Sequence, residues 1–150
     1  AAGAVPGPMD CYLALRRVKT VARRMEAHRR SAKELAEFLQ NQPKVTRVHY
    51  PGLPGHPGFE VAVRQMRDFG GMVSFEVESR DEAIHVAEST ELFFLAESLG
   101  GVESLIELPG PMTHASVSGS PIEVPDTLIR LSVGIEHPDD LVGDLEQALG

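Results

Sequence analysis

A long helical pattern over residues 8–42 constrains the fold of this chain more than any other sequence feature. Apolar side chains recur along it at spacings of three and four residues, with one interruption at Arg29. Pro8 fits the first turn of a helix, where its missing N–H group does no harm, and Pro43 ends the pattern. A helix of this length would span about 45 Å. Because that is long for a small domain, we expect a connecting helix that leads out of a larger protein, with residues 1–7 as the loop before it.

Shorter strand and helix patterns follow this long helix. Strands are predicted at residues 45–50, 71–77, 92–96 and 128–133, and helices at residues 59–66, 81–89 and 138–149. Residues 109–125 are rich in Gly, Ser and Pro and are predicted to form a loop. The order of elements predicts an α+β fold in residues 43–150, with a small sheet of about four strands and helices on one face.

The composition argues against several functional classes. The chain carries a net charge of −8, which argues against nucleic-acid binding because that function needs a basic surface. No apolar run approaches the roughly 20 residues of a membrane-spanning helix. The single cysteine, Cys11, permits no internal disulfide and indicates the reducing cytoplasm. The six histidines have no metal-ligand spacing, so no metal site is predicted.

The basic residues gather in the predicted long helix. Seven arginine and lysine residues lie between positions 16 and 30, and Glu26 and Glu34 lie among or beside them. Mixed charge along a helix is typical of a face that contacts solvent or another subunit. Anion binding is the alternative interpretation of this cluster.

One arginine, Arg130, interrupts the aliphatic strand pattern of residues 128–133. A buried arginine needs an anionic partner, because an unpaired buried charge is very unfavourable. Its planar guanidinium can hold a carboxylate through two parallel hydrogen bonds. The pattern alone favours a structural ion pair with an acidic residue of the same domain, and it leaves a ligand carboxylate as the alternative.

The second candidate feature is the turn at Glu97 and Ser98, where a strand pattern runs into Gly100 and Gly101. Glycines let backbone N–H groups approach a ligand closely, so Ser98 could bind the same anion as Arg130. Glu97 could bind a substrate ammonium group. An ordinary turn in contact with solvent is the alternative for both residues, and the glycine spacing does not match a nucleophile elbow.

The chain offers no candidate catalytic group. Its three lysines are Lys19, Lys33 and Lys44, and none has a setting typical of Schiff-base chemistry. The glycine pairs at 70–71 and 100–101 form neither a dinucleotide-binding fingerprint nor a phosphate-binding loop. The residues alone therefore predict half of a binding site for a small carboxylate, with no catalytic, cofactor-binding or metal-binding residue.

Longer motifs resemble one enzyme family. They are LAESLGGVESLIELP at residues 95–109, MTHAS at 112–116, DTLIRLSVGIE at 126–136 and DLEQAL at 144–149. Further matching segments are residues 3–13, 15–20, 24–25, 50–54, 64–66 and 69–74. Together these motifs are similar to the C-terminal part of the Cys/Met-metabolism pyridoxal-phosphate enzymes, and the resemblance covers essentially the whole chain.

The resemblance implies a fold and a cofactor. The implied fold is the C-terminal domain of a fold-type I pyridoxal-phosphate-dependent transferase, with a small, mostly antiparallel sheet that a long helix joins to an N-terminal cofactor domain. Pyridoxal 5'-phosphate (PLP) would serve the full-length parent as an electron sink. The family's cofactor lysine lies in a Ser-x-Thr-Lys-type motif that this sequence lacks. This chain by itself is therefore expected to bind no cofactor and to be inactive.

The resemblance also implies site residues and an activity. Ser98 and Arg130 match the positions that hold the substrate α-carboxylate, and Glu97 matches a position linked to a preference for cystathionine-type substrates. The implied parent is a homotetramer that joins an O-acylated homoserine to cysteine, which gives cystathionine for methionine biosynthesis. Cleavage of cystathionine by the same residues is the alternative within the family. A non-catalytic binding or assembly module is the alternative from another class.

Overall fold

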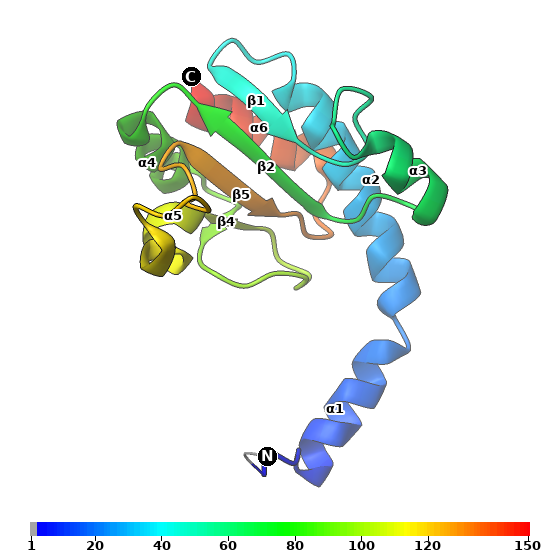
Figure 1. Cartoon of the computed structure of the whole chain (residues 1–150). Helices are drawn as coiled ribbons and strands as arrows, with labels where there is room; N and C mark the ends of the chain where they lie inside the picture. The colour runs from blue at the N-terminus through cyan, green and yellow to red at the C-terminus, as the bar shows by residue number, and fades with distance from the viewer. Residues whose placement is uncertain (1–2) are drawn as a thin grey trace.

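The computed structural model describes residues 3–150, so residues 1 and 2 of the loop predicted over 1–7 lie outside the described part. Five strands form one sheet in the order β1-β2-β5-β4-β3 (Figure 1). Their bounds are Val45–His49 for β1, Met72–Val77 for β2, Phe94–Leu95 for β3, Leu105–Glu107 for β4 and Leu128–Ser132 for β5. Neighbouring strands are antiparallel except β3 and β4. The expected small, mostly antiparallel sheet is confirmed.

Two local predictions were wrong around β4. Strand β4 was not among the four ranges predicted as strands, because it has only three residues and shows no alternating pattern. It is a strand because it pairs with the long central strand β5. The loop predicted over residues 109–125 contains a short helix, α5 (Pro109–Thr113), and a 3₁₀ turn, Ala115–Val117. Pro109 starts α5 because proline suits the first helical position.

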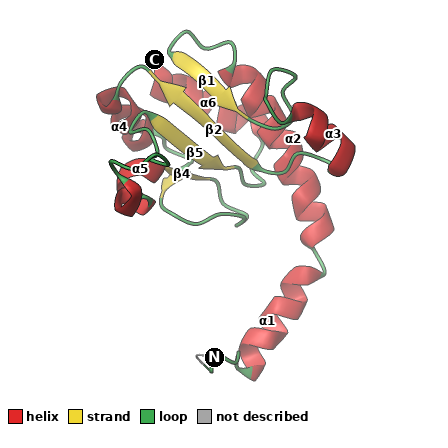
Figure 2. Ribbon diagram, in the orientation of Figure 1, coloured by secondary structure: helices red, strands yellow, loops and turns green. Residues whose placement is uncertain are grey.

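Three helices cover one face of the sheet, as predicted. They are α2 (Val21–Leu39), α4 (Arg80–Ser89) and α6 (Pro138–Leu149), while α3 (Phe59–Gln65) lies between β1 and β2 in the chain. In Figure 2, α2 and α6 lie behind the strands. The core between these layers contains fully buried side chains from both, including Leu35, Phe75, Ile106, Ile129 and Leu145. Burial of such side chains supplies the main driving force for this packing.

The other face of the sheet is polar at its centre. Successive side chains of a strand point to opposite faces, so the neighbours of the core residues point away from the helices. Ser74 of β2, Arg130 of β5 and Glu107 of β4 are register partners across three adjacent strands. This row places the candidate arginine on the face that α2, α4 and α6 leave open.

The uninterrupted helix expected over residues 8–42 is instead two helices, α1 (Pro8–Val18) and α2. The break lies at Thr20, whose hydroxyl donates a hydrogen bond to the carbonyl oxygen of Arg17 at 3.0 Å. The backbone N–H of Thr20 donates to the same oxygen at 3.1 Å. A threonine side chain that competes for a backbone carbonyl favours the end of a helix over its continuation. The apolar spacing runs through the break and therefore did not reveal it.

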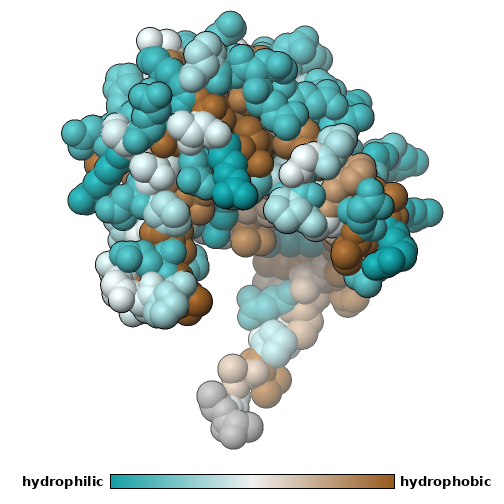
Figure 3. All heavy atoms as spheres, turned by 45° about the horizontal axis from the view of Figure 1, so that its top comes forward, coloured by the Kyte–Doolittle hydropathy of each residue, from teal (hydrophilic) through white to brown (hydrophobic). Residues whose placement is uncertain are grey.

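Helix α1 projects away from the body of the molecule (Figure 1) and has no buried residue. Its exposed hydrophobic side chains include Met9, Tyr12, Leu15 and Val18, and Figure 3 shows hydrophobic residues on this projecting part. Among residues 3–150, no helix is long and apolar enough to cross a membrane. That α1 leads into a further domain stays a prediction.

Tyr50 links the end of β1 to the core and gives a test at alkaline pH. It is buried, its hydroxyl donates to the carbonyl oxygen of Gly70 at 3.2 Å, and its ring meets Phe69 edge-on. Burial, with a further contribution from the Asp68 carboxylate, raises the pKa of Tyr50 from 10.0 to about 12. Between these values the unfolded chain is ionised at this residue while the folded chain is not. Stability from this group is therefore complete below pH 10 and is lost as the pH rises toward 12.

We expect Tyr50→Phe to remove this alkaline loss. A two-unit difference in pKa corresponds to at most about 2.7 kcal/mol in the free energy of unfolding. Below pH 9 the variant should be less stable by about 1 kcal/mol, because the hydrogen bond to Gly70 is gone. Urea unfolding of both proteins from pH 8 to pH 11.5 measures the difference. Parallel stability curves for the two proteins above pH 10 would contradict the prediction.

Candidate carboxylate-binding site

Arg130 is partly buried on the open face of the sheet, where its side chain is 23% exposed. Its Nη1 atom lies 3.1 Å from Oε1 of Glu107, and its Nη2 atom donates to the carbonyl oxygen of Ser98 at 3.0 Å. Its Nε atom is buried and has no hydrogen-bond partner among residues 3–150. A guanidinium carries five N–H donors, so these two contacts and the buried Nε leave one further N–H on each Nη atom that can bind an anion.

The acidic partner of Arg130 is Glu107. The strand pattern predicted an acidic partner from the same domain but did not identify which residue it is. The side chain of Glu107 is 2% exposed, so the acidic member of the ion pair is fully buried. The signal was present in the sequence, because Glu107 is the only charged residue in the otherwise apolar run 105–109. It was missed because β4, the strand that brings this carboxylate beside Arg130, was not predicted.

The structure brings Ser98 to Arg130 through its backbone carbonyl. The backbone of Ser98 has φ = 102°, in the left-handed region that residues with a Cβ atom rarely adopt. The turn is held against β5 because the N–H of Gly100 donates to Oγ of Ser132 at 2.9 Å. Ser98 itself is exposed. Strained backbone of this kind gathers at ligand-binding sites, where the surrounding structure holds it in place.

Glu97 is not brought into contact with the other two candidates. It is exposed, and within residues 3–150 its side chain makes no hydrogen bond and no ion pair. It lies next to Ser98 in the chain, at the start of the same turn. A role for Glu97 in specificity stays a prediction.

The segment that carries this turn is anchored at its start by Asp144 of α6. The buried Asp144 carboxylate accepts hydrogen bonds from the N–H groups of Glu91, Leu92 and Phe93 at 2.7, 2.9 and 3.1 Å. Hydrogen bonds to a charged acceptor are stronger than neutral ones. The path of the chain into β3 is therefore tied to the helical layer.

The end of the same segment is anchored by Glu136. Its two carboxylate oxygens accept hydrogen bonds from the N–H and the hydroxyl of Ser104, both at 2.8 Å. The Ser104 hydroxyl oxygen in turn accepts from the N–H of Gly134 at 2.8 Å, and the N–H of Ile135 donates to the carbonyl of Val102 at 2.9 Å. These contacts fix residues 102–104 against the segment that follows β5, so the turn at Ser98 is held at both ends.

A surface hollow of about 510 Å³ lies beside this turn. Residues 98–103 line one side, and Arg17, Thr20 and Arg24 line the other. Nη1 of Arg24 reaches the carbonyl oxygen of Gly100 at 3.5 Å. Neither Arg130 nor Glu97 lines this hollow, so it adjoins the candidate site without containing its arginine.

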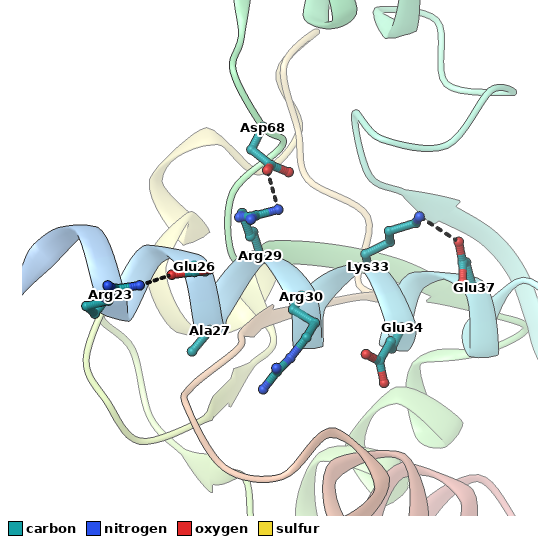
Figure 4. Close-up of a pocket in the computed structure, with 9 residues that line it drawn as sticks. All are labelled: Arg23, Glu26, Ala27, Arg29, Arg30, Lys33, Glu34, Glu37 and Asp68. Atoms are coloured by element: carbon teal, nitrogen blue, oxygen red, sulfur yellow. Dashed lines mark hydrogen bonds and ion pairs between the residues drawn. The ribbon is translucent and has the colours of Figure 1, made fainter.

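The basic cluster of the predicted long helix lies mainly along α2, beside a groove of about 520 Å³ (Figure 4). Three basic side chains that line this groove have acidic partners: Arg23 with Glu26, Arg29 with Asp68, and Lys33 with Glu37. All six side chains are at least one third exposed. Exposed pairs contribute at most about 1 kcal/mol each, and the alternation of charges does not form an anion site. This groove favours the interpretation of a solvated, mixed-charge face.

The described residues do not fit the cofactor that the resemblance implies. PLP is held by a lysine amine, and no lysine among the described residues makes a hydrogen bond with Arg130. Lys33 pairs with Glu37, Nζ of Lys44 donates to the carbonyl oxygen of Gly150 at 3.0 Å, and Lys19 follows the end of α1. Among residues 3–150, no three His, Cys, Asp or Glu side chains lie together as a metal site. The arrangement can bind and orient a carboxylate.

The strained backbone at Ser98 leads to a prediction for a matched pair of variants. Ser98→Ala and Ser98→Gly both remove the hydroxyl, but only the glycine variant removes the Cβ atom that disfavours φ = 102°. Relief of this strain, about 1–3 kcal/mol, outweighs the greater freedom of glycine in the unfolded chain, about 0.5–1 kcal/mol. We expect the glycine variant to be the more stable of the two by about 1 kcal/mol in urea unfolding. A glycine variant less stable than the alanine variant would contradict the assigned conformation.

Comparison with known sequences gives a consistent result. The profile of the family described as "Cys/Met metabolism PLP-dependent enzyme" matches residues 1–150. The chain is 61% identical over 150 residues to the cystathionine gamma-synthase of Mycobacterium tuberculosis strain H37Rv, a match that covers 99% of this chain and 39% of that protein. It is 57% identical over 151 residues to the cystathionine gamma-lyase of Dictyostelium discoideum, covering 98% of this chain and 39% of the relative.

Two further matches extend this similarity. The chain is 51% identical over 150 residues to a cystathionine beta-lyase of Lactococcus lactis, covering 98% of this chain and 40% of the relative. The crystal structure of metB from Corynebacterium glutamicum superposes with a TM-score of 0.96 at 51% identity, covering 98% of this chain and 38% of that one. The chain thus spans 39–40% of the length of these curated relatives.

Proposed function

The chain belongs to the Cys/Met metabolism PLP-dependent enzyme family, and from this premise we propose that it is the C-terminal, substrate-binding part of a cystathionine gamma-synthase. The proposed full-length enzyme joins O-succinyl- or O-acetylhomoserine to cysteine, which gives cystathionine. It acts in the cytoplasm as a homotetramer. In this proposal residues 1–7 and 8–42 connect residues 43–150 to an N-terminal domain that holds PLP.

The observation that carries the proposal is the placement of Arg130. Its guanidinium is held between the Glu107 carboxylate and the Ser98 carbonyl, with further donors not used within residues 3–150. A partly buried arginine held in this way is suited to a planar, bidentate partner such as the α-carboxylate of an amino acid. The identity of 61% to a cystathionine gamma-synthase supports the choice of amino-acid substrate.

The residues of this chain bind and orient the substrate in the proposed enzyme. Arg130 pairs with the α-carboxylate, and the hydroxyl of the exposed Ser98 adds a hydrogen bond to it. Fixing the carboxylate fixes the directions of the other bonds at the α-carbon, which is the part of catalysis that positioning supplies. PLP, when bound by the rest of the protein, would supply the electron sink for reaction at the amino acid.

Glu97 is the proposed specificity determinant for the group at the distal end of the substrate. Its side chain is exposed, and Glu97 directly precedes Ser98, the proposed carboxylate contact, in the chain. A carboxylate at that place can attract the ammonium group of a second amino-acid moiety, which both cysteine and cystathionine carry. In this proposal Glu97 favours substrates that have two amino-acid ends.

Cystathionine gamma-lyase is the second candidate, because the similarity to the Dictyostelium lyase is nearly as high, at 57%. The deciding assay incubates the full-length protein with O-succinylhomoserine plus cysteine, and separately with cystathionine alone. Rapid formation of cystathionine in the first reaction supports the synthase, while release of cysteine in the second supports the lyase. The 150-residue chain alone is the negative control. A full-length protein that binds amino acids but converts none of them would support the non-catalytic module.

A further inference from the structure

The buried carboxylate of Glu107 contacts the Arg130 guanidinium from the side away from solvent. We propose that Glu107 is the positioning residue that fixes the Arg130 guanidinium in the orientation that receives the substrate α-carboxylate. This inference rests on the proposed function, because it concerns the same site and adds the residue on which the geometry of Arg130 depends.

The contacts of Arg130 define its orientation at two atoms. Oε1 of Glu107, on the adjacent strand β4, holds Nη1 at 3.1 Å, and the carbonyl oxygen of Ser98 holds Nη2 at 3.0 Å. The hydroxyl of Thr113, at the end of α5, lies 3.4 Å from the same Oε1 atom. Two acceptors on separate elements therefore determine both the position and the plane of the guanidinium.

The burial of the two partners differs, and the difference sets the order in which a ligand meets them. The side chain of Glu107 is 2% exposed, whereas that of Arg130 is 23% exposed. A ligand that arrives from solvent therefore reaches Arg130 first, while Glu107 stays behind it. Within residues 3–150 the second oxygen of Glu107 is buried and has no hydrogen-bond partner, so the carboxylate acts through Oε1.

Stability alone does not explain this carboxylate. The desolvation of a buried ion pair largely offsets its attraction, and a well-packed apolar pair of similar volume is often as stable. A carboxylate beside Arg130 also reduces the net positive charge that attracts a substrate carboxylate. Its compensating effect is orientation. A free arginine side chain loses rotamer entropy when it binds a ligand, and an arginine that is already held in place loses less of it.

The test uses the full-length protein and two variants of nearly equal size. Glu107→Met fills the same volume but offers Nη1 no comparable acceptor, whereas Glu107→Gln keeps a carbonyl oxygen where Oε1 lies. Hydrogen bonds to charged groups correspond to roughly tenfold or more in affinity. We expect the methionine variant to raise the KM for the homoserine ester about tenfold or more, with a smaller change in kcat per folded enzyme. The glutamine variant is expected to keep a KM close to that of the wild-type enzyme.

Two further variants keep the test decisive. Glu107→Asp keeps the charge but withdraws the carboxylate by one methylene, and it is expected to raise KM as the methionine variant does, even if that variant folds poorly. In an Arg130→Lys background, Glu107→Met is expected to have no further effect on KM, because the planar guanidinium that Glu107 orients is absent. Glu88→Met, at an exposed position of α4, controls for a glutamate-to-methionine change elsewhere.

The outcomes separate the inference from the proposed function. Active wild-type protein whose KM is unchanged by both Glu107→Met and Glu107→Asp would overturn the positioning role alone. A fall in the amount of folded enzyme with KM unchanged would also overturn it, since a purely structural residue behaves in that way. A wild-type protein that acts on no amino acid would overturn the proposed function and this inference together.

Discussion

Replacement of Arg130 by alanine in the full-length protein is expected to raise the KM for the amino-acid substrate by a factor of about 30 to several thousand. The factor corresponds to about 2–5 kcal/mol, the usual effect of removing one partner of a desolvated charge pair. The physical reason is that the α-carboxylate loses the guanidinium that Ser98 and Glu107 hold in place. Steady-state kinetics with the homoserine ester as the varied substrate measures the change.

The same substitution has a second effect, on stability. It leaves the carboxylate of Glu107 buried without its cation, which is expected to lower the free energy of unfolding by about 3–5 kcal/mol. The double variant Arg130→Ala with Glu107→Gln removes the buried charge as well. It should recover much of the stability while KM stays high, and this separates loss of binding from loss of folding.

A matched control is Arg47→Ala, which removes an exposed arginine from strand β1 of the same sheet. It should leave both KM and the free energy of unfolding close to the wild-type values, because exposed charges contribute little. An Arg130→Ala variant that is folded and keeps a wild-type KM would contradict the assignment of Arg130 to the substrate carboxylate.

Gly134→Ala is expected to destabilise the chain by about 3 kcal/mol or more, as severe overpacking does. A Cβ atom at this buried position would lie 2.7 Å from the backbone nitrogen of Ser104 and would also overlap the carbonyl oxygen of Val102 and the carboxylate of Glu136. Two of these three groups are backbone, so the strain cannot be relieved by rotating a side chain. The measurement is the free energy of unfolding in urea.

The effect of Gly134→Ala should extend to the candidate site. The atoms that would be displaced are those that anchor residues 102–104, the end of the segment that carries Ser98. Gly143→Ala is the control, since a Cβ atom in that exposed turn of α6 would meet nothing within 4 Å. There, alanine should stabilise the chain by about 0.5–1 kcal/mol. Equal stabilities of the two alanine variants would contradict the packing described around Gly134.

The sequence predicted the elements whose patterns are long and whose boundaries carry a signal. Helix α6 begins at Pro138, because proline suits the first helical position, and α4 begins after Ser79, whose side chain accepts a hydrogen bond from the N–H of Glu82. The break between α1 and α2 was not predictable from hydrophobic spacing, because one threonine hydrogen bond produces it. Strand β4 was not predictable because its conformation depends on pairing with β5 rather than on its own three residues.

The candidate site was predictable in its parts but not in its connections. Arg130 stood out as a charge in an apolar strand, and Ser98 stood out at a glycine turn. The contact between them uses a backbone carbonyl and a positive φ, and neither leaves a mark in the sequence. The partner Glu107 depends on the register between β4 and β5, which only the folded sheet determines.

The most direct test of the carboxylate site compares two ligands in the full-length protein. One ligand is a non-reactive amino-acid analogue of the substrate, and the other is its carboxamide, which has the same shape but no charge at the carboxyl group. The site described here predicts that the wild-type protein binds the carboxylate at least about tenfold more tightly, and that Arg130→Ala binds both ligands equally. Retention of the wild-type preference in a folded Arg130→Ala variant would contradict it.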